Sequence, residues 1–75
     1  MNKSELIERT DDVLGGIPVF AGTRVPVRTL FDYLEAGDRL EDFLDDFPTV
    51  ERERAQAIIA LVRVELLAGV DASAA

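Results

Sequence analysis

Apolar residues recur at helical spacing in three stretches that follow residue 26. In the first two, about Val27–Ala36 and about Arg39–Phe47, four apolar residues fall at i, i+3, i+4 and i+7 and so share one face of a helix. They are Val27, Leu30, Phe31 and Leu34, followed by Leu40, Phe43, Leu44 and Phe47. Gly37 supplies a left-handed residue that ends the first helix, and Pro48 disfavours helical geometry at the residue before it. The pattern predicts two short amphipathic helices joined by a glycine turn.

The third stretch, about Glu51–Leu67, is apolar on two faces. At about 100° per residue, one face holds Ala55, Ile58, Ile59, Val62 and Leu66, and the nearly opposite face holds Ala57, Ala60, Leu61, Val64 and Ala68. A surface helix needs one apolar stripe, whereas a helix with two stripes is buried on two sides. We therefore predict that this helix gives its first face to its own domain. The second face, together with Leu67, is predicted to meet another chain.

The order of these helices resembles a three-helix helix-turn-helix core. Asp38 stands three residues before Glu41, which predicts a capping box with Asp38 at the start of the second helix. In a helix-turn-helix protein the last helix is the candidate for the DNA major groove. Arg52 and Arg54 in its first turn are then candidate DNA contacts, although the interleaved Glu51 and Glu53 would repel phosphate. The alternative is that these charges have no DNA-binding role and form a charge pattern at the helix start, where the carboxylates interact favourably with the helix dipole.

The region before the helices predicts β structure. Apolar residues surround a polar centre in residues 5–14, which suggests a short strand or an extended arm. Residues 15–27 are rich in β-branched residues, with Gly22 as a turn signal. Pro18 and Pro26 each lack a backbone donor and confine this segment to edge strands or an arm. The sequence therefore predicts a mainly α fold with a short N-terminal β-hairpin or arm.

We divide the chain into an N-terminal arm (1–12), one helical domain (13–67) and a frayed tail (68–75). A chain of 75 residues is one domain at most, and it is marginal in stability unless it is stapled or oligomeric. Hydrophobic residues make up 48% of it, which favours burial of apolar surface against a second chain, most simply in a homodimer.

Composition also excludes several kinds of chemistry. The chain has no cysteine and no histidine, which excludes disulfides, the usual zinc sites, thiol nucleophiles and imidazole bases. We expect no catalytic residue, no cofactor and no enzyme activity. No apolar run is long enough to cross a membrane, and the N-terminus lacks the basic and apolar regions of a signal peptide. A cytoplasmic protein is the expectation.

The net charge of −7 is distributed unevenly. Residues 1–30 hold four acids and four bases, whereas residues 31–75 hold eleven acids and four bases. The acids of the first two predicted helices are Asp32, Glu35, Asp38, Glu41, Asp42, Asp45 and Asp46. Three interpretations are open for them: a solvated helix face, a docking face for a basic partner, or a metal site, although the spacing does not fit a calcium loop of the EF-hand type.

Arg24 and Arg28 flank Pro26 in a stretch without nearby acids. They are the other two candidate DNA contacts, because guanidinium groups bind phosphate well. The alternative is structural, with Arg24 tying the arm to helix carboxylates such as Asp32 or Glu35.

Residues 15–27, Gly-Gly-Ile-Pro-Val-Phe-Ala-Gly-Thr-Arg-Val-Pro-Val, resemble the signature of the bacterial family "domain of unknown function 433". The resemblance continues through Leu34-Glu35-Ala36-Gly37 and Phe43–Val50 and covers roughly residues 10–65. It implies a homeodomain-like or winged helix-turn-helix core with short N-terminal strands. It also implies an antitoxin of the VapB class, which dimerises, binds a PIN-like ribonuclease toxin and represses its own operon.

The expected function is therefore that of an antitoxin of a type II toxin–antitoxin pair. In this hypothesis the third helix buries its apolar surface, and the acidic face masks a basic RNA path on the toxin. A stand-alone dimeric DNA-binding regulator is the alternative, and a homo-oligomer whose acidic surface only maintains solubility is a third hypothesis.

Overall fold

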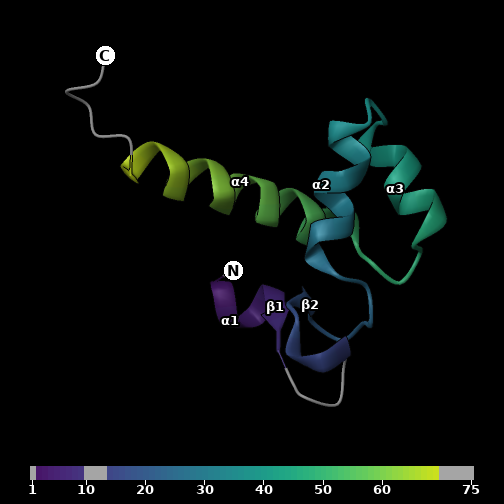
Figure 1. The fold of residues 1–75 in the computed structure, drawn as a ribbon, viewed down its shortest axis with the longest axis horizontal. Coiled ribbons are helices and arrows are strands. Elements are labelled where there is room, and N and C mark those ends of the chain that lie inside the picture. The colour runs from purple at the N-terminus through teal and green to yellow at the C-terminus, as the bar shows by residue number, and fades with distance from the viewer. Residues whose placement is uncertain (1, 10–13, 70–75) are drawn as a thin grey trace.

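The described part of the chain, residues 2–9 and 14–69 of a computed structural model, contains four α-helices, one short 3-10 helix and one small sheet (Figure 1). The helices are α1 (Lys3–Leu6), α2 (Val27–Glu35), α3 (Leu40–Asp46) and α4 (Arg52–Gly69), the strands are β1 (Ile7–Glu8) and β2 (Val19–Phe20), and the 3-10 helix is η1 (Leu14–Gly16). The mainly helical class is thus confirmed, and the three predicted helices correspond to α2, α3 and α4. A helix-turn-helix arrangement stays a prediction.

The connection between α2 and α3 corrects the predicted capping box. Gly37 has a φ of +89° and its N–H donates to the carbonyl of Leu34, while the N–H of Asp38 donates to the carbonyl of Tyr33 at 2.9 Å. The backbone of Asp38 is therefore part of the C-terminal cap of α2, as in a Schellman motif. The N-cap of α3 falls one residue later, at Arg39, and the Asp42 carboxylate rather than Glu41 accepts its N–H at 2.8 Å.

The N-terminal segment contains the predicted short strand, and a helix that was not predicted precedes it. Residues 3–6 form α1, whose N-cap Asn2 accepts the N–H of Glu5 through its side chain at 3.1 Å. The chain then becomes extended, and β1 pairs antiparallel with β2 in the register Ile7 to Phe20. Gly22, with a φ of +77°, lies in the predicted turn. The β structure is therefore present, as a strand at residues 7–8 paired with a strand at residues 19–20. Residues 10–13 of the predicted arm lie outside the described residues.

The core draws on every helix from α1 to α4. Its buried apolar residues are Leu6, Val19, Phe20, Val25, Leu30, Phe43, Val50, Ala55 and Ile58. Phe43 lies among three aromatic rings, with centroid distances of 5.9 Å to Phe20, 5.6 Å to Tyr33 and 5.2 Å to Phe47. The N-terminal arm is therefore part of the domain core, since Leu6 of α1 is buried in the same cluster as Phe43.

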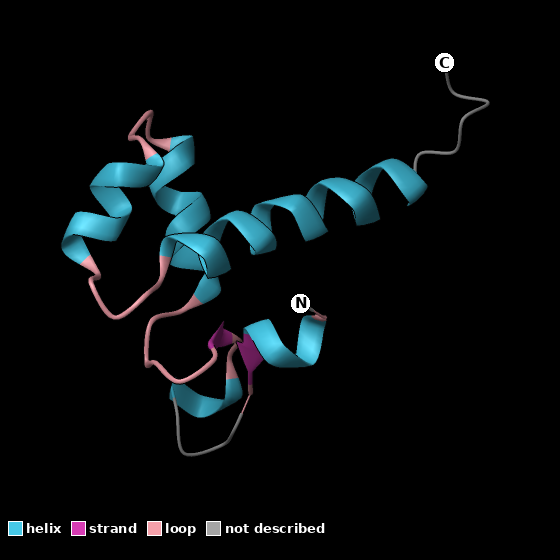
Figure 2. Ribbon diagram, turned by 180° about the vertical axis from the view of Figure 1, so that it is seen from behind, coloured by secondary structure: helices cyan, strands magenta, loops and turns pink. Residues whose placement is uncertain are grey.

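The long helix α4 begins beside α2 and ends away from the other elements. Figure 1 shows its last turns extending toward the C-terminus beyond α2 and α3, and Figure 2 shows the same arrangement from behind. Ala68 and Gly69, predicted to fray, form the end of this helix, and residues 70–75 lie outside the described residues. Within the described residues, no helix has the length and apolar character that crossing a bilayer requires.

Candidate binding surfaces

Burial of α4 changes along its length. Ala55 and Ile58 in its first half are fully covered. In its last turns four large apolar side chains are exposed: Val62 (44%), Val64 (60%), Leu66 (63%) and Leu67 (57%). We call residues 62–69 the distal end of α4. Large exposed apolar side chains gathered at one end of a helix are typical of an interaction site.

The predicted partner face is exposed in part. Ala60, Val64, Leu67 and Ala68 are exposed, whereas Ala57 and Leu61 are half-buried and pack against the core. The first face is also corrected, because Val62 and Leu66, predicted to pack inside the domain, are exposed. Among the described residues, α1 reaches the distal end of α4 through the Lys3–Glu65 ion pair, but it leaves Val62 and Leu66 exposed. The prediction separated buried from exposed residues only by their position around the helix. In the structure, burial also decreases from the first turns of α4 to its last turns.

The helix α1 explains why Leu61 is half-buried. The Arg54 guanidinium donates to the Glu5 carbonyl at 2.6 Å, and the Lys3 ammonium lies 2.9 Å from the Glu65 carboxylate. Positions 54, 61 and 65 are seven and four residues apart, so they share one side of α4. The short helix α1 therefore lies along the side that carries Leu61. The sequence offered no signal for these contacts, because the partners are far apart in the chain.

The structure gives two of the four candidate DNA-binding arginines partners within the chain. Arg52 pairs with Glu41 at 3.1 Å. Arg54 pairs with Glu51 at 3.3 Å and also holds α1. These contacts agree with a structural role at the start of α4.

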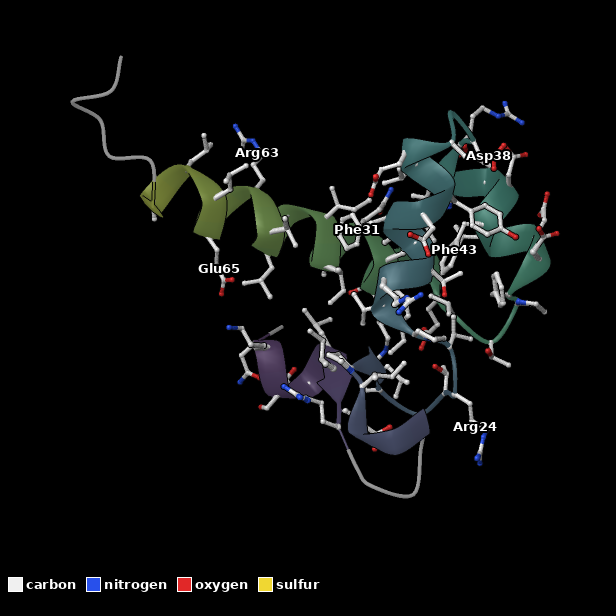
Figure 3. All side chains as sticks on the ribbon, in the orientation of Figure 1. Arg24, Phe31, Asp38, Phe43, Arg63 and Glu65 are labelled. Carbon is white, nitrogen blue, oxygen red and sulfur yellow. The ribbon has the colours of Figure 1, made fainter. Side chains whose placement is uncertain are left out.

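Arg24 and Arg28 are exposed, and within residues 2–9 and 14–69 neither lies within ion-pair distance of an acid. The expected ties from Arg24 to Asp32 or Glu35 are not formed. Figure 3 shows the Arg24 side chain pointing away from the helices. Arg24 and Arg28 thus remain available to an external anion, while Arg52 and Arg54 at the start of α4 are already engaged.

Comparison with known proteins places the chain in a family. The family described as "Protein of unknown function (DUF433)" matches residues 7–61, which is most of the chain. The chain belongs to the DUF433 family. It is similar to "Uncharacterized protein y4eO" of Sinorhizobium fredii (strain NBRC 101917 / NGR234), with 38% identity over 50 residues. That match covers 67% of this chain and 23% of the relative, so the chain spans less than a quarter of the relative's length. No solved structure matches.

The limits of the DUF433 match coincide with a change in the structure. The match ends at Leu61, and the next residue, Val62, is the first of the large exposed apolar side chains in α4. It begins at Ile7, directly after α1. The helix α1 and the distal end of α4 therefore both lie outside the matched region, and the Lys3–Glu65 ion pair joins them.

The second surface of this DUF433 chain is acidic. Residues 32–51 hold eight acids and one base, and of the acids only Asp42 is half-buried while the others are exposed. We call this set the acidic end: Asp32, Glu35, Asp38, Glu41, Asp42, Asp45, Asp46 and Glu51. It lies on α2, α3 and their connections, at the opposite end of the molecule from the distal end of α4 (Figure 1). Among the described residues, no group of acids is placed to hold a metal ion.

Glu41 accepts a hydrogen bond from Arg52, and this partner affects its ionisation. Its own backbone N–H, followed by the hydrogen bond from Arg52, holds the pKa of Glu41 below its ordinary value. A carboxyl group whose pKa is lower in the folded state than in the unfolded state stabilises the fold at pH values above its ordinary pKa. This contribution is lost as the pH falls through the pKa of the folded state. We expect Arg52→Gln to raise the pKa of Glu41, measured by NMR titration of its side-chain carboxyl carbon. The control Arg63→Gln, which removes an equal charge farther along α4, should leave that pKa unchanged, and an equal rise in both variants would contradict the assignment.

Proposed function

We propose that this protein is the antitoxin of a type II toxin–antitoxin pair, which binds and neutralises a PIN-like ribonuclease. The observation that carries the proposal is the exposed apolar surface of α4, where Val62, Val64, Leu66 and Leu67 lie uncovered by the described chain. An apolar surface of this kind is stable in water when a second polypeptide covers it. The protein therefore works as a binding module in a complex.

The acidic end supports the class of partner. Eight acids against one base in residues 32–51 create a strong negative potential on one end of the molecule. Such a potential repels RNA and attracts proteins with basic surfaces, and it speeds the encounter of the two. A ribonuclease binds its substrate along a basic path, and the acidic end is suited to cover that path.

The resemblance of residues 15–27 to the DUF433 signature supports the same function, because it implies an antitoxin of the VapB class. It also implies a helix-turn-helix core, and α2, α3 and α4 supply three helices for such a core. We extend the proposal to a cytoplasmic protein that carries no active site of its own.

The test is to identify a small ribonuclease-like reading frame next to the gene and to co-express the two proteins. We expect the pair to copurify and growth inhibition by the ribonuclease to be relieved. In the double variant Asp38→Asn and Asp45→Asn the dissociation constant should rise about fivefold, because two attractive charges are lost from the docking face. Glu5→Gln with Glu53→Gln makes the same change in net charge outside the acidic end and should leave affinity unchanged. Separate purification with persisting toxicity would reject the proposal.

A second function, repression of its own operon, has one observation in its favour. Arg24 and Arg28 are exposed and have no acidic partner among the described residues. Binding to promoter DNA should weaken steeply with salt, and Arg24→Ala should reduce the salt dependence by about one phosphate contact. Gel-shift titrations with and without toxin measure this, and the absence of a shift at low salt would remove the function.

A further inference from the structure

We draw no further inference here: the strongest candidate, the exposed apolar surface at the distal end of α4, carries nothing beyond the proposed function, because nothing among the residues that the structure describes shows what covers it.

Discussion

Replacing Phe43 by alanine should lower the free energy of unfolding by about 3–5 kcal/mol, the usual cost of removing a buried aromatic ring. Phe43 is fully covered and contacts Phe20, Tyr33 and Phe47. The loss combines the transfer of the ring to water with the cavity that it leaves behind. At about 0.05–0.15 kcal/mol per residue, a domain of this size has a total stability of only about 4–11 kcal/mol. The variant should therefore be close to unfolding at room temperature.

Urea unfolding followed by circular dichroism measures this effect. Leu66→Ala is the control, because it removes apolar atoms from an exposed position of α4. It should change the free energy of unfolding by no more than about 0.5 kcal/mol. Equal losses in the two variants would mean that the aromatic cluster is not the centre of the core.

The two short helices and their buried residues could be predicted from the sequence. Leu30 and Phe43 fall on apolar stripes with i, i+3, i+4 spacing, and both are fully covered in the structure. The signals involved are local: a helical period, a glycine with positive φ after α2, and a proline after α3. The predicted ends lie within two residues of the observed ones for this reason.

The N-terminal helix could not be predicted from periodicity, because four residues are barely one turn. Residues 3–6 fold as α1 since Asn2 caps them and since the rest of the chain holds them. The contact between Arg54 and the Glu5 carbonyl spans 49 positions, and no local pattern encodes it. One signal was present and was not used: Asn2 followed three residues later by Glu5 has the spacing of a capping box.

The candidate binding surfaces were predicted with similar limits. The two-faced pattern of α4 indicated surplus apolar surface, and the exposure of Val64 and Leu67 agrees with it. The pattern could not show how far the rest of the domain extends along the helix, which is a property of tertiary packing. Arg52 and Arg54 likewise stand at the predicted helix start, but their partners Glu41 and Glu5 became evident only in three dimensions.

The second large effect is expected for Leu6→Ala, which should lower the free energy of unfolding by about 2–5 kcal/mol. Leu6 is almost completely covered in the core cluster although it lies at the N-terminus, outside the DUF433 match. Its side chain anchors α1 beside α4, where Arg54 already binds the Glu5 carbonyl. Loss of this anchor should also release β1 from β2, since β1 follows Leu6 directly.

Chemical denaturation measures the loss in Leu6→Ala, and hydrogen exchange at the Ala21 amide, which donates to the Leu6 carbonyl, reports whether the segment has detached. Lys3→Ala provides the comparison. Its ion pair with Glu65 is more than half exposed at both side chains, 62% and 54%, and such pairs contribute about 0–1 kcal/mol. If Leu6→Ala were as stable as Lys3→Ala, the N-terminal helix would contribute little to the stability of the domain. A large difference between them makes α1 a structural part of the domain, and its position along Leu61 then sets how much of α4 remains free for a partner.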